Sequence, residues 1–335
     1  MSKNISKKTN KDKGLTLTEV LITALISLII LSIFYMLFRG INLEARYAET
    51  WSDINNIVNG INSKIKQEII SCEYMFDRND SNIILTRLVG NNNFLSNSAF
   101  PQIQSSISDF SELNFPNNNV GNRIMFLKFL GYITLSNAGG NPDNDVAIPK
   151  YQIVMIYLSP SNINFKGYNL NLINPVISRS EYIYSNETLK SLTTISNNLG
   201  SQIQSYIFID KDNINNLNNF FVNYNPSITP PWQVYDGKIR IVSNEVIMKA
   251  FSYNNIFYSI AYNRNISPFN NLGINYRVPV WASSNDNFPS GLEFIVIGNK
   301  TARKLYVRTA VIAQVKLDKF YFQADNAVIN FSDKF

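Results

Sequence analysis

The sequence predicts an α+β protein in which one long N-terminal helix packs on an antiparallel β-sheet head. Two observations predict the helix: an uncharged run from Val20 to Phe38 and a helical pattern of apolar side chains from Leu43 to Cys72. A third predicts the head, because the apolar segments after Cys72 are short and rich in β-branched and aromatic residues. An apolar content of 45% in 335 residues is sufficient for a large folded core.

Residues 15–38 are predicted to form the membrane half of this helix. At 1.5 Å per residue, the uncharged run from Val20 to Phe38 spans roughly 28 Å, close to the thickness of the hydrocarbon core. Only Arg39 follows it closely, whereas the segment before it contains Lys3, Lys7, Lys8, Lys11 and Lys13. Basic residues favour the cytoplasmic side, so the N-terminus is expected in the cytoplasm and the head outside.

Three interpretations of the N-terminal segment compete: a secretory signal peptide, a plain membrane anchor, and a cleaved leader followed by an assembly helix. A secretory signal has a shorter apolar stretch that ends in a small-x-small cleavage site, whereas this run ends in Phe38-Arg39-Gly40-Ile41. A plain anchor gives no reason for Gly14 at the polar boundary or for Glu19 at the start of the apolar run. The junction between leader and helix therefore favours the third interpretation.

That junction reads Lys13-Gly14-Leu15-Thr16-Leu17-Thr18-Glu19 and resembles the leader of type IV prepilins and type II secretion pseudopilins. In that family a basic leader ends in Gly, a prepilin peptidase cuts after it, the new N-terminus is methylated, and the fifth mature residue is Glu. The resemblance implies that residues 1–14 are the leader. It also assigns processing to Gly14 and Leu15, and assembly to Thr16, Leu17 and Glu19. Leu15 and Thr18 depart from the commoner Phe or Met and from the usual aliphatic residue.

The chemistry of two residues supports this interpretation independently. Gly14 lacks a side chain and lets an extended backbone enter a protease site. Glu19 is an ionisable group at the membrane edge, where such groups usually have partners. A structural alternative for Glu19 is a capping box, because Thr16-Leu17-Thr18-Glu19 fits the Ser/Thr-x-x-Glu pattern of helix starts. The two roles are compatible.

Residues 39–72 are predicted to be the amphipathic half of the helix and to pack on the sheet of the head. Their apolar stripe recurs at intervals of three and four residues: Leu43, Tyr47, Trp51, Ile54, Val58, Ile61, Ile65, Ile69 and Cys72. A coiled-coil stem is the alternative, since the stripe is heptad-like. Cys72 is expected to be buried. As the chain has one Cys and no His, an intramolecular disulfide and Cys/His zinc sites are excluded.

Residues 73–335 are predicted to form the β-rich head. Strands are expected at 83–89, 123–135, 151–158, 203–209, 238–251, 256–262, 292–297 and 305–316. Hairpins are expected at Ser252–Asn255 and Gly298–Lys300. Residues 159–232 are rich in Asn and Pro and are interpreted as an insertion or the joint of a second subdomain, with short helices at Glu187–Leu199 and Asp212–Val222.

No catalytic residue, cofactor or metal site is predicted. Asp210–Asn213 and Asn141–Asp145 are oxygen-rich, but neither fits a calcium-loop pattern, and solvated turns are favoured. Of the formal charge of +6, residues 1–14 supply +4, from five Lys and one Asp. No basic patch interleaved with aromatics remains to predict a nucleic-acid site.

The family resemblance implies a function without catalysis. It predicts a minor type IV pilin or pseudopilin: a filament subunit that is anchored in the membrane and then assembled into a cell-surface filament. The implied partners are other pilins or pseudopilins, the prepilin peptidase, the inner-membrane platform machinery and membrane lipid. The alternative is a membrane-anchored extracellular adhesin or binding protein that does not polymerise.

Overall fold

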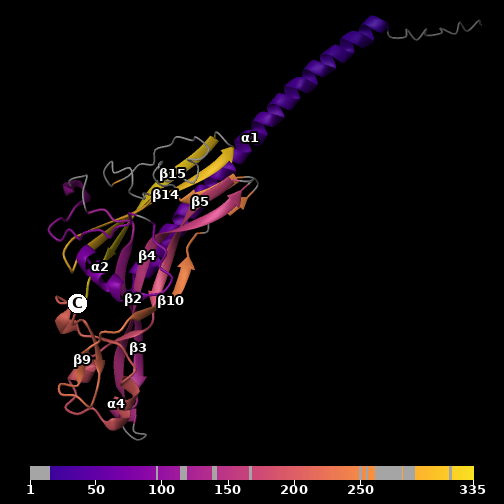
Figure 1. Ribbon diagram of the computed structural model, residues 1–335. Helices are drawn as coiled ribbons and strands as arrows, with labels where there is room; N and C mark the ends of the chain where they lie inside the picture. The colour runs from indigo at the N-terminus through magenta and orange to yellow at the C-terminus, as the bar shows by residue number, and fades with distance from the viewer. Residues whose placement is uncertain are drawn as a thin grey trace, which may run out of the picture. The chain divides into compact units, whose positions relative to one another are not determined.

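The structure, a computed structural model, describes residues 16–95, 97–113, 119–137, 142–165, 168–248, 251–253, 256–260, 281, 291–316 and 319–335. The chain divides into two compact units, residues 1–52 and residues 53–335, the second of which is called the head unit below. One helix, α1 (Leu17–Ile69), runs through both. The fold is α+β, as predicted, because α1 is combined with two large β-sheets (Figure 1).

The first sheet has ten strands in the order β2-β10-β5-β4-β6-β7-β8-β9, with β3 beside β4 and β1 beside β3. Two neighbouring pairs, β2 with β10 and β6 with β7, are parallel, so this sheet is mixed, although its other neighbouring strands are antiparallel as predicted. The strands are β1 (Cys72–Met75), β2 (Leu88–Val89), β3 (Ile124–Leu135), β4 (Val146–Phe165), β5 (Tyr168–Ser180), β6 (Ile183–Ser185), β7 (Phe208–Ile209), β8 (Phe221–Tyr224), β9 (Trp232–Val234) and β10 (Ile239–Val246).

The second sheet has five antiparallel strands: β11 (Phe251–Tyr253), β12 (Ile256–Ile260), β13 (Leu292–Ile297), β14 (Arg303–Lys316) and β15 (Lys319–Phe331). β12 and β13 pair with successive parts of β14, and β15 pairs along its whole length. Both predicted hairpins, β11–β12 and β13–β14, are confirmed. Gly298 turns the second one with a φ of +94°, and a Cβ there would lie 2.1 Å from the carbonyl oxygen of Ala302.

Several local predictions were wrong. The segment Ile83–Val89 was expected to be a strand but lies mostly in α2 (Arg78–Arg87). The buried residues of α2, Ser81 and Ile84, are three positions apart, which is a helical interval. Helix α1 ends at Ile69, before Cys72, because Cys72–Met75 pairs with β3. The strand expected at 203–209 is only β7.

The region 159–232 contains the end of β4, all of β5, β6, β7 and β8, and the first residue of β9, which all belong to the ten-stranded sheet. Its helices are α3 (Glu187–Lys190) and α4 (Asn197–Ile203), which replace the single predicted helix Glu187–Leu199. The predicted helix Asp212–Val222 is wrong: it holds only part of a 3-10 turn, Lys211–Asn213, and the first residues of β8. Its Asn-rich sequence favours turns over helix.

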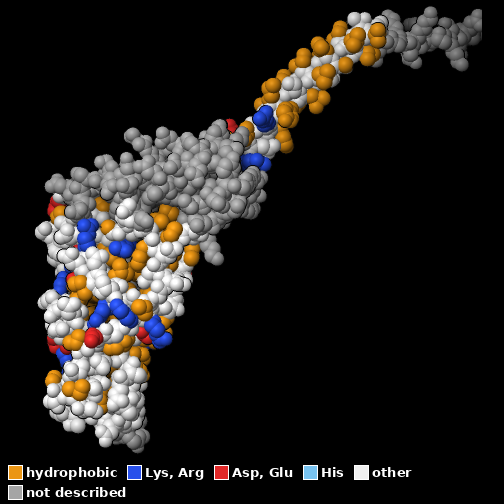
Figure 2. Space-filling view, viewed as in Figure 1, with side chains coloured by type: hydrophobic (Ala, Val, Ile, Leu, Met, Phe, Trp, Pro, Cys, Tyr) orange, Lys and Arg blue, Asp and Glu red, His pale blue; other side chains and the backbone are white. Residues whose placement is uncertain are grey.

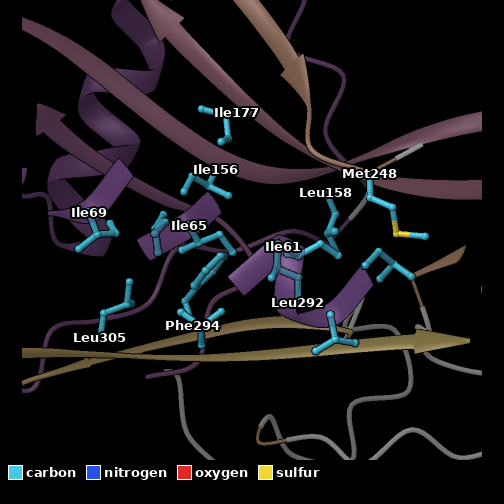
Figure 3. Packing of buried hydrophobic residues seen from close by; sticks show 14 of the residues in the cluster. Ile61, Ile65, Ile69, Ile156, Leu158, Ile177, Met248, Leu292, Phe294 and Leu305 are labelled. Carbon is cyan, nitrogen blue, oxygen red and sulfur yellow. The ribbon is translucent and has the colours of Figure 1, made fainter. Parts of the chain in front are cut away.

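The C-terminal part of α1, from Asp53 to Ile69, lies between the two sheets (Figure 3). The stripe positions from Ile54 onward are 0–4% exposed: Ile54, Val58, Ile61, Ile65, Ile69 and Cys72. They pack on one side against Ile156, Leu158 and Ile177 of the first sheet and on the other against Leu292, Phe294 and Leu305 of the second. The predicted packing is confirmed for Ile54 to Cys72, where the head unit's own strands cover the positions that a coiled coil would need, whereas Trp51 of the same stripe is 40% exposed.

The other face of the first sheet is buried as well. Alternate residues of β3 and β4 point away from α1 into a second core cluster with Phe76 and Ile84: Met125, Leu127, Ile153, Met155 and Tyr157. Burial on both faces explains why these strands are continuous apolar runs and not alternating ones.

An alternating chain of charges joins α1 to the first sheet. Glu68 of α1, whose side chain is 6% exposed, accepts from Lys128 of β3 and Arg179 of β5, each at 2.7 Å. Arg179 also pairs with Glu245 of β10 at 2.8 Å, and Glu245 pairs with Lys64 of α1 at 2.9 Å. Burial raises the pKa of Glu68, but its hydrogen bonds to Lys128 and Arg179 and their charges outweigh burial and hold the pKa below 4.5.

We expect Glu68→Gln to lower the urea midpoint of unfolding at pH 7, because two cations lose their charged acceptor. The pKa is depressed in the folded state, so the stabilisation is complete above the ordinary value of 4.5 and is lost as the pH falls through the folded value. The gap between wild type and variant should therefore close on acidification. Glu187→Gln is the control, since it breaks an exposed pair with Lys211. A gap that persists unchanged at low pH would contradict this assignment.

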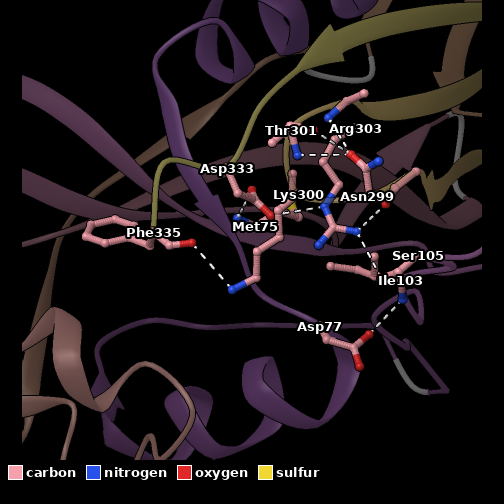
Figure 4. A network of polar contacts seen from close by, with 12 residues as sticks. Met75, Asp77, Ile103, Ser105, Asn299, Lys300, Thr301, Arg303, Asp333 and Phe335 are labelled. Atoms are coloured by element: carbon pink, nitrogen blue, oxygen red, sulfur yellow. Dashed lines mark hydrogen bonds and ion pairs between the residues drawn. The ribbon is translucent and has the colours of Figure 1, made fainter.

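The C-terminal residues are fixed to both β1 and β14 (Figure 4). Asp333, whose side chain is fully buried, accepts from Arg303 Nε and from the backbone N–H of Met75, each at 3.0 Å. Lys334 pairs with Glu73 at 2.6 Å, and the Phe335 ring lies edge-on to Tyr74. The last residues of the chain thus close the head unit onto its first strand.

Candidate membrane and assembly segment

α1 begins with the capping box that its sequence predicts. The backbone N–H and the hydroxyl of Thr16 donate to Oε2 of Glu19 at 2.8 and 2.9 Å, and the N–H of Glu19 donates back to Thr16 Oγ1 at 3.4 Å. Two N–H groups that a helix start leaves without partners are therefore satisfied reciprocally.

This cap uses only one oxygen of the carboxylate. Both bonds reach Oε2, and Oε1 accepts no hydrogen bond from any described residue. A carboxylate has about four acceptor positions, so Glu19 can keep its cap and still accept a cation. Glu19 can therefore cap the helix through Oε2 while Oε1 binds a cation.

The other predicted residues of this segment take different places. Gly14 and Leu15 lie outside the described residues. Leu17 is the first helical residue and is 79% exposed, without a part in the cap. Sequence reasoning missed Thr23, whose hydroxyl donates to the carbonyl oxygen of Glu19 at 2.7 Å. A Thr four residues after a helix-start acid was the available signal.

The helix is apolar on all sides after Glu19. Large apolar side chains from Val20 to Phe38 are 48–69% exposed, and Figure 2 shows them along the visible face of the helix. A helix that is hydrophobic all round belongs in a protein core or in a membrane, and no described part of the chain covers this one. Within the described residues, α1 is the helix that is long and apolar enough to cross a membrane.

The oxygen-rich turn at Asp210–Asn213 holds a cation of the chain itself. Lys190 Nζ lies 2.6 Å from Asp210 and 3.1 Å from Asp212, and Asp210 also accepts from the side chain of Asn213. The described residues contain no group of three or more His, Cys, Asp or Glu side chains placed to hold a metal ion. Of the second turn, Asn141 lies outside the described residues, and Asp143 and Asp145 are exposed.

Comparisons with protein-family models, with curated proteins and with solved structures found no match for this chain.

Proposed function

We propose that this chain is a minor type IV pilin or pseudopilin, a non-catalytic filament subunit that is processed by a prepilin peptidase and assembled through α1. The observation that carries the proposal is the composition of one helix. α1 starts with a capped acid that has a free oxygen, continues as an uncovered apolar rod, and ends as part of the core of the head unit.

Each part of α1 has a task in this proposal. Before assembly, the apolar part holds the subunit in the membrane as a single-pass protein, with the leader in the cytoplasm and the head outside. After cleavage, the amine of Leu15 is a new positive charge beside Glu19. In a filament the amine of one subunit binds the free oxygen of Glu19 in the next, and the apolar helices replace lipid with one another. The platform machinery transfers subunits from the bilayer to the cell-surface filament.

The rival function, an anchored adhesin that does not polymerise, uses the same membrane helix and head. It gives no role to Gly14 or to the free oxygen of Glu19. Neighbouring genes for a prepilin peptidase, an assembly ATPase and a polytopic platform protein are expected on our proposal, and their absence from the whole genome would contradict it.

We expect the mature protein to begin at Leu15. N-terminal sequencing of protein from sheared surface filaments tests this directly, and Met1 or Ser2 as the first residue would reject the assignment. Gly14→Val should leave the full-length form in the membrane, because a branched side chain crowds the extended backbone at the cut. Gly40→Val is the control, since no atom lies within 4 Å of the place where its Cβ would be.

A further inference from the structure

A groove of about 530 Å³ is lined in part by the segments that follow α4 and β9. These two elements lie at one end of the head unit (Figure 1). Four of the residues that line it are tyrosines: Tyr182, Tyr184, Tyr206 and Tyr235. One wall comes from β6 and the segment before β7, and the other from the chain that leads from β9 into β10. Filament assembly through α1 gives this groove no role.

Strand register brings the tyrosines together. Tyr182 and Tyr184 flank the buried Ile183, so their rings leave the strand on the same side. β6 pairs in parallel with β7 through Tyr184 and Phe208, which brings Tyr206, two residues before Phe208, close to Tyr184. The rings of Tyr184 and Tyr206 are stacked, with centroids 4.5 Å apart and an interplanar angle of 26°.

This stacked pair is held rigidly from behind. The fully buried ring of Phe208 lies 6.1 Å from Tyr184 and 6.2 Å from Tyr206. Trp232 packs edge-on against Phe208 at 5.2 Å and contacts Tyr224 at 5.3 Å. A flat aromatic surface that is already fixed in place loses little conformational entropy when it binds a ligand.

The polar groups of the groove are free to bind. Within the described residues, the hydroxyls of Tyr182, Tyr184 and Tyr206 make no hydrogen bond, nor do the side chains of three further lining residues, Gln204, Ser205 and Asn223. Burial and the neighbouring phenols raise the pKa of Tyr184, which therefore stays a protonated donor. Flat rings beside unpaired hydroxyls and amides suit a sugar, because its C–H face packs on a ring while its hydroxyls bond to the polar groups.

The charge of the groove is positive. Glu181 is already neutralised, since it accepts from the backbone N–H of Arg240 at 2.7 Å and from its guanidinium at 3.1 Å. Lys238, which lines the groove, donates to the carbonyl oxygen of Thr86 at 2.6 Å, and Lys150, which does not line it, lies 4.3 Å from the centre of the Tyr182 ring. Neither lysine has a carboxylate partner among the described residues, so the groove favours a ligand with negative charge.

We propose that this groove binds an acidic oligosaccharide, with one sugar ring on the exposed Tyr182, beside the stack of Tyr184 and Tyr206, and a carboxylate next to Lys238. A single-stranded nucleic acid also stacks on aromatic rings, but it needs a row of cations along its backbone. The groove instead offers more unpaired hydroxyls and amides than cations. The site does not depend on polymerisation, and its failure would leave the proposed filament function untouched.

The test uses the full chain in lipid nanodiscs, which avoids sugar-based detergents, and titration calorimetry with three acidic probes: a hyaluronan hexasaccharide, a hexamannuronate and sialyllactose. At least one should bind the wild type. Tyr182→Ala should weaken that binding at least tenfold, and since Tyr182 is 51% exposed, its loss leaves the core intact. Lys238→Gln should weaken it severalfold and reduce its dependence on salt. Tyr206→Phe, which keeps the stack, should weaken it less than Tyr182→Ala.

Two matched controls keep the test specific. Tyr132→Ala removes a tyrosine that is 66% exposed and lies outside the groove, and Lys304→Gln removes a lysine that also bonds only to a backbone carbonyl, that of Ser108. Both should bind like the wild type. Absence of binding by all three probes, equal losses in the controls, equally tight binding of neutral cellohexaose, or binding of oligothymidylate in place of the saccharides would each overturn the proposal.

Discussion

Glu19→Gln is expected to lower incorporation of the cleaved protein into filaments at least tenfold, whereas Thr16→Ala should leave it largely intact. Gln at this position still completes a capping box but carries no charge for the amine of a neighbouring subunit. Ala at position 16 removes the hydroxyl of the cap and keeps the carboxylate. The measurement compares each variant in sheared filaments with its cleaved form in the membrane.

The two variants separate the two roles of Glu19, which a change to Ala would remove together. If Glu19 served only as a cap, the order would reverse: Glu19→Gln would assemble normally and Thr16→Ala would be the weaker variant. Equal amounts of cleaved protein in the membrane show that insertion and processing are unaffected. Glu44→Gln, on the same helix but away from its start, is a control for the loss of one negative charge.

Ile65→Ala is expected to lower the free energy of unfolding by about 2–5 kcal/mol, the usual range for emptying a buried aliphatic site. Ile65 is 0% exposed and lies between the two sheets, so neither sheet can close the cavity without leaving the other. Urea unfolding of the full chain, followed by near-UV circular dichroism, gives the difference in free energy.

Ile70→Ala is the matched control, because the residue type is the same and the site directly follows α1, yet its side chain is 68% exposed. Its effect should stay within about 0.5 kcal/mol. Equal midpoints for the two variants would mean that the end of α1 contributes no more to the core than the surface does.

The sequence predicts α1 and the buried part of its stripe well, because an uncharged apolar run is followed by apolar residues at helical intervals over a long segment. Ile54, Val58, Ile61 and Ile65 recur at helical intervals with mostly polar residues between them, and no strand pattern competes. The hairpin at Gly298 was predictable for a local reason, since its backbone conformation requires glycine.

Short apolar runs were less informative. Ile83-Ile84-Leu85 fits a strand or a helix, and the burial of Ile84 decides between them. β5 and β15 were missed although Tyr168–Leu172 alternates apolar and polar residues as a strand does, because its Asn-rich composition also favours turns. β5 and β15 form because they pair along their length with β4 and β14. The amino-acid pattern within each strand does not reveal which other strand it pairs with.

Of the two candidate sites, the sequence predicts the first in part and the second not at all. Four residues of sequence predict the capping box of Thr16 and Glu19. Only the folded geometry shows that both bonds from Thr16 reach Oε2 of Glu19 and leave Oε1 for another partner. The tyrosine groove could not be predicted at all, because its walls come from segments between Glu181 and Arg240 that meet through non-local contacts, among them the parallel pairing of β6 with β7 and the bonds between Glu181 and Arg240.

The position of α1 between the two sheets also fixes when the protein can finish folding. Asn62 of α1 accepts from the hydroxyl of Thr309 of β14, 247 residues later in the chain. At ribosomal rates of about 5–20 residues per second, roughly 12–50 s pass between the synthesis of the two. During that interval the apolar stripe of α1 has one of its two covering sheets missing. Nascent chains are thus exposed to aggregation until the last strands emerge, and early termination anywhere before β14 leaves the stripe uncovered on that side.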